Sequence, residues 1–367
     1  MEKSDPNLNS FDTGSDQTLV IADQSVAKES DMDAVSTLPV KPQDRYKFIR
    51  SIGFGGMKAV LLVYDMDTGR EVAMAMMPDF QNRSQADLTR FMHEARITAR
   101  LEHPNIIPVY DMGLDKQGAP FFTMKYLRGE SLAQLLQRVR EKDPQAEAEY
   151  SLSRILQIFI RVCNAVQFAH SRNVLHLDIK PNNVSLGDFG EVSVLDWGLA
   201  AEMVSGPDGK RRLTRPVSKG TPGFMSPEQV VGGTELDERA DIYSLGALLY
   251  AMLTLHNPLI NQDADHALDA VMQDKIPAPS EANPERDIPA ALEAVVLKAM
   301  AYRPQDRYLS VKDLRADVVS FQGGFAPQAE NASVIRKLAL FINRNFVVTV
   351  LLGIIAVLVA ALVFVLQ

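Results

Sequence analysis

The residues best suited to chemistry lie in two short segments of a 367-residue chain. The first segment, residues 176–183, contains Asp178, Lys180 and Asn183, and the second begins at Asp196. The spacing is five residues from Asp178 to Asn183 (183 − 178) and thirteen from Asn183 to Asp196 (196 − 183). Carboxylate and amide oxygens are hard ligands that suit magnesium, and a lysine offers a positive charge to phosphate. These residue types therefore suit a site that holds phosphate together with a divalent cation.

The two segments resemble the catalytic loop and the metal-binding triplet of eukaryotic-type protein kinases. The chain has His176-Leu177-Asp178-Ile179-Lys180-Pro181-Asn182-Asn183 for the family's His-Arg-Asp-Leu-Lys-Pro-x-Asn, and Asp196-Trp197-Gly198 for Asp-Phe-Gly. A literal Asp-Phe-Gly at 188–190 lies only five residues after Asn183 (188 − 183), in an expected turn between two short strands. The resemblance implies that Asp178 accepts the proton of a substrate hydroxyl and that Lys180 steadies the phosphate. Asn183 and Asp196 would hold magnesium.

Further motifs follow in the order of the family, so that the resemblance covers about residues 46–321. Thr221 to Glu228 is similar to the end of an activation segment, Asp241 begins the motif of a buried central helix, and Arg307 is expected to pair with Glu228. The resemblance implies an α+β, two-lobed protein kinase fold over residues 45–322, with a small antiparallel β lobe that has one helix and a larger, mainly α-helical lobe. Lys180 and Thr221 favour the branch that transfers phosphate from ATP, with magnesium, to Ser or Thr of protein substrates.

The elements that must position these residues can be predicted from local patterns. Three antiparallel strands are expected at 46–52, 59–64 and 71–76, followed by a helix at 84–101 with Ser84 as its N-cap. By resemblance this helix supplies Glu94 to the site. An extended segment at 121–127 is the expected hinge, with Met124 as gatekeeper and the backbone of Lys125 to Leu127 holding adenine. A helix should begin near 128–131, and residues 141–149 are predicted to form a surface loop.

The third predicted strand lacks the lysine that the family uses to bridge the nucleotide and Glu94. It has Val72-Ala73-Met74-Ala75, and the glycine-rich loop, Gly53-Phe54-Gly55-Gly56-Met57-Lys58-Ala59-Val60, has Lys58 in place of its third glycine. Alternate side chains of a strand share a face, so Lys58 should point the same way as Val60, toward Ala73 and Ala75 on the neighbouring strand. The resemblance makes Gly53, Gly55, Val60 and Ala73 part of the nucleotide site.

Two interpretations of this substitution stay open. In the first, Lys58 carries the displaced charge to the phosphates and to Glu94, an arrangement similar to that of the with-no-lysine kinases, which are active. In the second, Lys58 is a solvated lysine, Ala75 marks a degenerate nucleotide site, and the chain is a catalytically dead pseudokinase that acts as a signalling scaffold.

Two other residues depart from the family motifs. Leu177 replaces the arginine that usually pairs with a phosphorylated activation loop, and Trp197 replaces a phenylalanine. The basic residues around Thr214 and Ser218 are interpreted as a solvated loop or, alternatively, as a specific dock, and phosphorylation of Thr214, Ser218 or Thr221 is a separate hypothesis.

Composition separates the first 44 residues from the rest. They contain nine Asp or Glu and three Lys, which accounts for −6 (3 − 9) of the net charge of −8. Such a segment predicts a disordered acidic tail, in which Thr18 to Ile21 is a short apolar patch or, alternatively, a phosphothreonine docking motif. The remaining chain is close to neutral, so no nucleic-acid partner is expected.

The single cysteine, Cys163, fits a reducing compartment. It should pack in the core on a helix at 151–171. The six histidines are scattered along the chain, which predicts no zinc site.

The last part of the chain is apolar. Residues 346–366 are 21 residues (366 − 346 + 1) without a charge, enough at about 1.5 Å per residue to cross a bilayer core of roughly 30 Å. The sequence therefore predicts a C-terminal transmembrane helix after a juxtamembrane linker at 323–345. Arg336, Lys337 and Arg344 precede the span, which predicts a single-pass protein of the cell membrane with residues 1–345 in the cytoplasm. An outer domain beyond Gln367 and a homodimer are left open.

Overall fold

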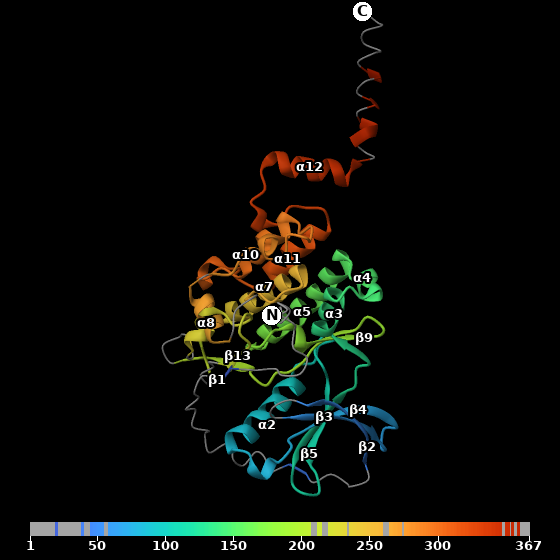
Figure 1. The fold of residues 1–367 in the computed structure, drawn as a ribbon, viewed down its shortest axis with the longest axis vertical. Coiled ribbons are helices and arrows are strands. Elements are labelled where there is room, and N and C mark those ends of the chain that lie inside the picture. The colour runs from blue at the N-terminus through green and yellow to red at the C-terminus, as the bar shows by residue number, and fades with distance from the viewer. Residues whose placement is uncertain are drawn as a thin grey trace, which may run out of the picture.

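The chain folds into two lobes. The computed structural model describes residues 19–20, 38–39, 45–54, 58–206, 211–214, 219–232, 235–259, 264–273, 275–346, 349–352, 354–355 and 358–359. Figure 1 shows a small lobe with a β-sheet at one end and a larger lobe made mainly of helices above it. The predicted two-lobed arrangement is confirmed.

The small lobe is built on an antiparallel five-stranded sheet with the strand order β2-β3-β4-β6-β5. Its strands are β2 (Tyr46–Phe54), β3 (Ala59–Asp65), β4 (Arg70–Met76), β5 (Val109–Leu114) and β6 (Pro120–Lys125). The three strands predicted at the start of the domain are thus confirmed. In the register of the sheet Val60 lies opposite Ala75, and Ala73 lies opposite Met124. Three positions predicted to surround a nucleotide, Val60, Ala73 and Met124, therefore lie on adjacent strands with Ala75.

One helix covers the sheet. Helix α2 (Gln85–Arg100) follows a short 3₁₀ turn, η1 (Phe80–Asn82), and begins where the sequence predicts, because the Ser84 side chain accepts a hydrogen bond from the N–H of Asp87. Phe91, Met92 and Ala95 of α2 are buried and pack against Ala75 and Phe122 of the sheet. This apolar contact fixes the face of α2 that also carries Glu94.

The large lobe has most of the helices. They are α3 (Leu132–Arg140), α4 (Pro144–Glu149), α5 (Leu152–Ser171), α6 (Pro227–Val231), α7 (Glu238–Thr254), α8 (Ala264–Met272), α9 (Pro279–Ala282), α10 (Ala290–Ala299), α11 (Val311–Gln322) and α12 (Val334–Arg344). Short 3₁₀ helices are η2 (Pro181–Asn183), η3 (Pro304–Asp306) and η4 (Gln328–Glu330).

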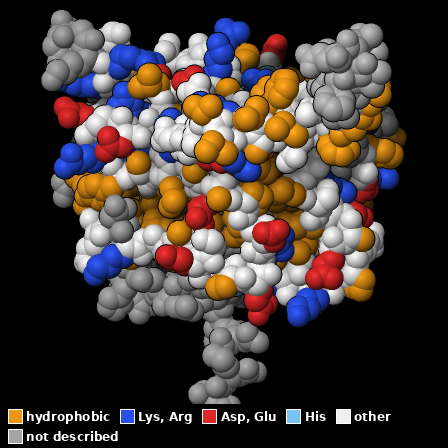
Figure 2. Space-filling model, turned by 90° about the horizontal axis from the view of Figure 1, so that it is seen from above, with side chains coloured by type: hydrophobic (Ala, Val, Ile, Leu, Met, Phe, Trp, Pro, Cys, Tyr) orange, Lys and Arg blue, Asp and Glu red, His pale blue; other side chains and the backbone are white. Residues whose placement is uncertain are grey.

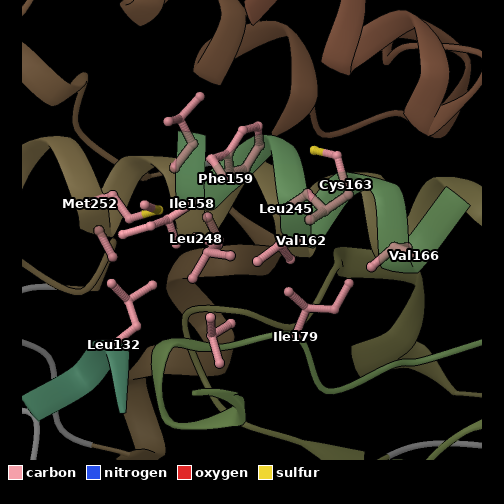
Figure 3. Close-up of a cluster of buried hydrophobic side chains, with 14 of the residues drawn as sticks. Leu132, Ile158, Phe159, Val162, Cys163, Val166, Ile179, Leu245, Leu248 and Met252 are labelled. Atoms are coloured by element: carbon pink, nitrogen blue, oxygen red, sulfur yellow. The ribbon is translucent and has the colours of Figure 1, made fainter. Parts of the chain in front are cut away.

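The core of the large lobe lies between α5 and α7. Figure 3 shows Phe159, Val162 and Cys163 of α5 near Leu245 and Leu248 of α7. The prediction that Cys163 packs in the core is confirmed, and burial raises the pKa of its thiol. Because α7 is buried on all sides, it is a rigid base for any residue that it holds.

Short strands surround the catalytic loop. A three-stranded sheet has the order β10-β9-β7, and a second has the order β12-β11-β8. The strands are β7 (Gly129–Ser131), β8 (Val174–Leu175), β9 (Val184–Gly187), β10 (Val192–Val194), β11 (Ala201–Ser205) and β12 (Arg211–Leu213). A two-residue pair joins β1 (Leu19–Val20) to β13 (Lys219–Gly220). Residues 19–20 belong to the predicted acidic tail, and they lie against the activation segment.

The prediction of a surface loop at 141–149 is wrong over most of its length. The segment forms α4 instead, because the Asp143 side chain accepts the N–H of Ala146 and Pro144 occupies the first turn of the helix. Only 141–143 connect α3 to α4. The acidic composition of the segment obscured an N-terminal capping signal.

The predicted pair between Arg307 and Glu228 is confirmed. The guanidinium of Arg307 makes two contacts with the Glu228 carboxylate, Nη1 to Oε1 at 2.6 Å and Nη2 to Oε2 at 2.8 Å. The same guanidinium donates to the backbone carbonyls of Ala301, Arg239 and Tyr302. The Arg307 side chain is completely buried, so it ties the end of the activation segment to the helices beneath it.

We expect Arg307→Met to destabilise the fold strongly. The substitution leaves the Glu228 carboxylate without its cation and three backbone carbonyls without a donor, and breaking a buried pair costs roughly 3–5 kcal/mol. Urea unfolding followed by fluorescence measures the change. Arg303→Met, at an exposed position of the same turn, is the matched control and should shift the free energy of unfolding by less than about 0.5 kcal/mol. Equal unfolding midpoints for the two variants would contradict this account.

The prediction of a transmembrane helix at 346–366 is corrected by the structure. No helix within the described residues has both the length and the apolar character to cross a membrane. Helix α12 ends at Arg344 with Asn345 as its C-cap, and residues 347–348, 353, 356–357 and 360–367 lie outside the description.

The large-lobe end of the molecule has apolar side chains on its surface. Figure 2, seen from above, shows hydrophobic side chains gathered in patches with charged side chains between them. Helix α12 has Val334 and Ile335 at 83% and 80% exposure, and Leu338 and Phe341 are also exposed. In Figure 1 this helix lies beyond α11, at the end of the large lobe that is farthest from the sheet.

Candidate active site

The catalytic loop is held from below by Asp241 on α7. The Asp241 carboxylate accepts the backbone N–H groups of His176 and Leu177, each at 2.8 Å, and it contacts His170 Nε2 at 2.7 Å. Asp241 is completely buried; burial acts to raise the pKa of its carboxyl, but His170 and the N–H donors outweigh this effect and the pKa is lowered. An ionised carboxylate on a rigid helix therefore fixes the backbone immediately before Asp178.

Leu177, which replaces the arginine of the family motif, has an apolar role. Its backbone is left-handed, with φ of 63°, and its side chain is 1% exposed. It packs with Met203 of β11 and Leu213 of β12. The catalytic loop therefore contacts the activation segment through an apolar cluster at this position.

Asp178, Lys180 and Asn183 converge on one point together with Thr221. Asp178 Oδ1 accepts the Thr221 hydroxyl at 3.0 Å, and Asp178 Oδ2 accepts Asn183 Nδ2 at 3.1 Å. Lys180 Nζ donates to Thr221 Oγ1 at 2.9 Å and lies 3.3 Å from Asp178 Oδ2. Three residues predicted from the sequence are thus in contact, and a hydroxyl already lies against the Asp178 carboxylate.

A hairpin brings Asn183 and Asp196 side by side. Strands β9 and β10 pair with Val184 opposite Val194, and the N–H of Leu195 donates to the Asn183 carbonyl at 2.8 Å. The literal Asp-Phe-Gly at 188–190 forms the turn at the far end of this hairpin, where Phe189 is 94% exposed. The sequence-based interpretation of that match as a turn between two strands is confirmed.

Lys58 lies directly before β3 and bridges two acidic residues of the site. Its Nζ is 2.5 Å from Glu94 Oε1 and 3.0 Å from Asp196 Oδ1. The Lys58 side chain is 23% exposed, whereas Glu94 is buried on α2. One ammonium group therefore joins the glycine-rich loop, the helix of the small lobe and the Asp196 segment.

The electrostatic environment keeps this ammonium charged. Burial acts to lower the pKa of Lys58, but the charges of Asp196 and Glu94 outweigh burial, so the pKa is raised. Burial also acts to raise the pKa of Asp196, yet Lys58 outweighs it and the pKa is lowered. For Glu94 burial is the largest influence, and the pKa is raised although Lys58 opposes it. Lys58 and Asp196 are thus ionised at neutral pH.

Ala75 has the surroundings of a packing residue. It is 0% exposed and contacts the apolar face of α2 at Phe91, Met92 and Ala95. Val60, two residues after Lys58, lies directly opposite Ala75. The position where the family has its lysine is adjacent in space to the strand from which Lys58 enters.

The remaining nucleotide-site predictions lie on the surrounding strands and the segment after β6. Met124 is half-buried on β6 and packs with the cluster under α2, and Gly53 lies in β2, where an added Cβ would meet Val60 at an ordinary 3.8 Å. Gly55 lies outside the described residues. The N–H of Lys125 donates to the Pro108 carbonyl at 3.1 Å, so this backbone group is already engaged. Leu127 lies after β6 in the connection to β7.

The donor set fits magnesium. Mg²⁺ takes hard oxygen ligands and is commonly bound by one or two protein groups together with substrate phosphates. Asp196 offers an ionised carboxylate, and Asn183 turns its amide nitrogen to Asp178, which leaves the amide oxygen as the other polar atom of that side chain. No cluster of three or more acidic, His or Cys side chains that would bind a metal without phosphates occurs in the described part of the chain.

Two residues of the site were not singled out from the sequence. Asp241 was identified only as the start of a buried helix, and its contacts to the loop appear once α7 is placed beneath it. Gly198 permits the close approach of two carboxylates, because an added Cβ would lie 3.1 Å from Asp196 Oδ1 and 3.2 Å from Glu94 Oε2. Its place in the Asp196 triplet was the available signal.

We expect Asp241→Asn to lower both stability and turnover. The asparagine side chain has an NH₂ group in place of one carboxylate oxygen. This NH₂ group would face either the N–H of Leu177 or the N–H groups of His176 and His170, none of which can accept its hydrogen bond. The loss of a hydrogen bond to a charged group costs about 1.5–3 kcal/mol of stability. Urea unfolding measures the stability, and the split between kcat and the KM for ATP tests positioning. A merely structural role predicts a lower unfolding midpoint with unchanged kcat for the folded fraction.

The chain also matches proteins of known type. The family model described as "Protein kinase domain" matches residues 46–318. The chain belongs to the protein kinase family. The predicted membership of the protein kinase family is confirmed, and the family implies the use of ATP and Mg²⁺.

Similar curated proteins are bacterial kinases. The chain is 38% identical over 290 residues to "Serine/threonine-protein kinase PknD" of Chlamydia felis, a match that covers 75% of this chain and 30% of that protein. It is 37% identical over 300 residues to the protein of the same name from Chlamydia pneumoniae, with 77% and 31% covered. For Chlamydia trachomatis serovar D the identity is 35% over 314 residues, with 80% and 33% covered. The matched region thus spans about a third of the length of these relatives.

Proposed function

We propose that this chain transfers the terminal phosphate of ATP, with magnesium, to Ser or Thr hydroxyls of proteins, and that Lys58 replaces the absent third-strand lysine. The observation that supports this proposal is the double contact of Lys58 Nζ with Glu94 and Asp196. A pseudokinase with a solvated lysine at the loop tip offers no reason for that contact. The membership of the kinase family supports the reaction type.

Each residue then has a distinct task. Asp178 accepts the proton of the substrate hydroxyl, as the Thr221 hydroxyl on its carboxylate illustrates. Lys180, next to Asp178, holds positive charge beside the transferred group. Asn183 and Asp196 would hold magnesium, which would neutralise charge on the phosphate oxygens. Lys58 binds phosphate oxygens and keeps α2 close through Glu94.

Apolar side chains of β3, β4 and β6 line the proposed site for the adenine base of the nucleotide. Val60 lies on the strand next to Ala73, and Ala73 lies opposite Met124, so the three form a continuous lining from adjacent strands. Small side chains at this place leave space for a flat ring, and burial of the ring excludes water from the phosphate end. The backbone carbonyl of Lys125 and the N–H of Leu127 are the proposed polar contacts of adenine.

Turnover of radiolabelled ATP by the 367-residue chain tests the proposal. Label should appear on Ser or Thr of an acceptor such as casein in the presence of Mg²⁺, and EDTA should abolish it. The pseudokinase alternative predicts no label on any acceptor with Mg²⁺ or Mn²⁺. Acid hydrolysis of the labelled acceptor identifies the residue type, and label on tyrosine alone would contradict the Ser/Thr assignment.

A further inference from the structure

The N-terminal segment contacts both lobes at described positions. In β1, Leu19 pairs with Gly220 and Val20 pairs with Lys219, and Figure 1 shows β1 beside β13. Nearer the domain, Leu38 packs against the apolar cluster under α2, and the Pro39 carbonyl accepts the N–H of Leu114 at 3.2 Å. The segment is therefore fixed on the small lobe and also meets the activation segment.

The strand that β1 meets borders the candidate active site. Gly220, the last residue of β13, directly precedes Thr221, whose hydroxyl contacts Asp178 at 3.0 Å and Lys180 at 2.9 Å. A substrate hydroxyl must approach the same carboxylate. Because β13 pairs with β1 in a two-stranded sheet, the paired edge of β13 next to this approach is occupied by the chain itself.

Charge favours the same contact. Residues 1–44 have nine acidic side chains and three lysines, whereas the activation segment from Lys210 to Lys219 has five basic residues and none that is acidic. The basic residues are Lys210, Arg211, Arg212, Arg215 and Lys219. Opposite net charges on two segments of one chain attract over a distance of about one Debye length, roughly 8 Å at physiological salt.

We propose that residues 19–20 are an intramolecular strand that occupies the edge of β13 and competes there with protein substrates. The inference rests on the proposed function and adds a regulation to it. The edge of a strand accepts any extended segment through its main-chain groups, so a substrate that pairs with β13 must displace β1. Tethering keeps the segment at a high effective concentration, while a pair of two residues is weak enough to be displaced.

The experiment compares variants of the whole 367-residue chain. Leu19→Pro combined with Val20→Pro removes two backbone donors and fixes both φ angles, which breaks the pairing with β13. Ala27→Pro, in the same tail, is the matched control with unchanged charge and length. Hydrogen exchange at the amides of 219–221 measures the docking without any need for catalysis. Steady-state kinetics with a Ser/Thr peptide acceptor, selected from a peptide library, measure the competition.

We expect faster hydrogen exchange at the amides of 219–221 in the double variant. Its KM for the peptide should be lower by roughly fivefold, which corresponds to the loss of about one net hydrogen bond between β1 and β13. Its KM for ATP should be unchanged. A synthetic peptide of residues 15–26 should inhibit the double variant competitively against the peptide acceptor. Equal exchange rates in the double variant and the Ala27→Pro control would overturn the docking. Faster exchange with an unchanged peptide KM would overturn the competition. Absence of transfer in every protein would refute the proposed function, and the exchange rates would still decide the docking.

Discussion

Replacement of Lys58 by methionine is expected to lower the rate of phosphate transfer by roughly 10²- to 10³-fold, the range for removal of one preorganised electrostatic group. Methionine keeps most of the length of the side chain and removes only the ammonium that contacts Glu94 and Asp196. Single-turnover transfer of radiolabel to casein measures the effect. Lys47→Met, at an exposed position of the neighbouring β2, is the matched control and should leave the rate unchanged. An equal rate in the Lys58 and Lys47 variants would exclude Lys58 from the reaction.

A second substitution tests whether the charge has been relocated. Lys58→Gly should be inactive, and Ala75→Lys in the same protein should restore part of the rate, because Ala75 lies on the strand adjacent to the entry of Lys58 and faces α2. Restoration should be incomplete. Ala75 is fully buried against Phe91 and Met92, and added bulk in a packed core costs typically 1–3 kcal/mol. A double variant as inactive as Lys58→Gly, yet equally well folded by circular dichroism, would count against relocation.

Asp178→Asn is expected to lower kcat by roughly 10²- to 10⁴-fold while the affinity for ATP stays the same. The amide cannot take the proton of a substrate hydroxyl. Lys58, Glu94 and Asp196, which lie on the nucleotide side, keep their contacts with one another. Isothermal titration with ATP and Mg²⁺ measures the affinity, and label transfer measures the rate. A large loss of ATP affinity would show that Asp178 supports the nucleotide rather than the acceptor.

Asp188→Asn is a control that the chain itself offers for this variant. Asp188 belongs to the literal Asp-Phe-Gly of the sequence, and it is exposed in the β9–β10 turn, next to Phe189 at 94% exposure. We expect wild-type transfer from Asp188→Asn. A loss comparable to that of Asp178→Asn would overturn the assignment of Asp196 as the functional triplet.

Spacing favoured Asp196 over Asp188 as the metal-binding residue because the intervals between these motifs match those of the protein kinase family. The distance of thirteen residues from Asn183 to Asp196 is the length of a hairpin that returns the chain to its start, and the N–H of Leu195 on the Asn183 carbonyl closes it. Alternation of side chains along a strand likewise placed Lys58 on the side of Val60. The alternation argument is local and needs no knowledge of the tertiary fold, whereas the spacing argument rests on the resemblance to the family.

The contacts of Asp241 were not predictable in the same way. Its carboxylate meets the N–H groups of His176 and Leu177, 65 and 64 residues away, and only the packing of α7 beneath the loop brings them together. The N-cap at Asp143 was predictable but was outweighed by the acidic composition of its surroundings. For the apolar residues 346–366, composition indicated a transmembrane helix, whereas the described residues contain no helix of that kind.

A crystal structure of the full chain with Mg²⁺ and a non-hydrolysable ATP analogue is the most direct test of the role of Lys58. We expect Lys58 Nζ within about 4 Å of a phosphate oxygen, the usual limit of an ion pair, with Glu94 still in contact with the same ammonium. An ammonium of Lys58 turned into solvent, with no other protein cation beside the phosphates, would contradict the account.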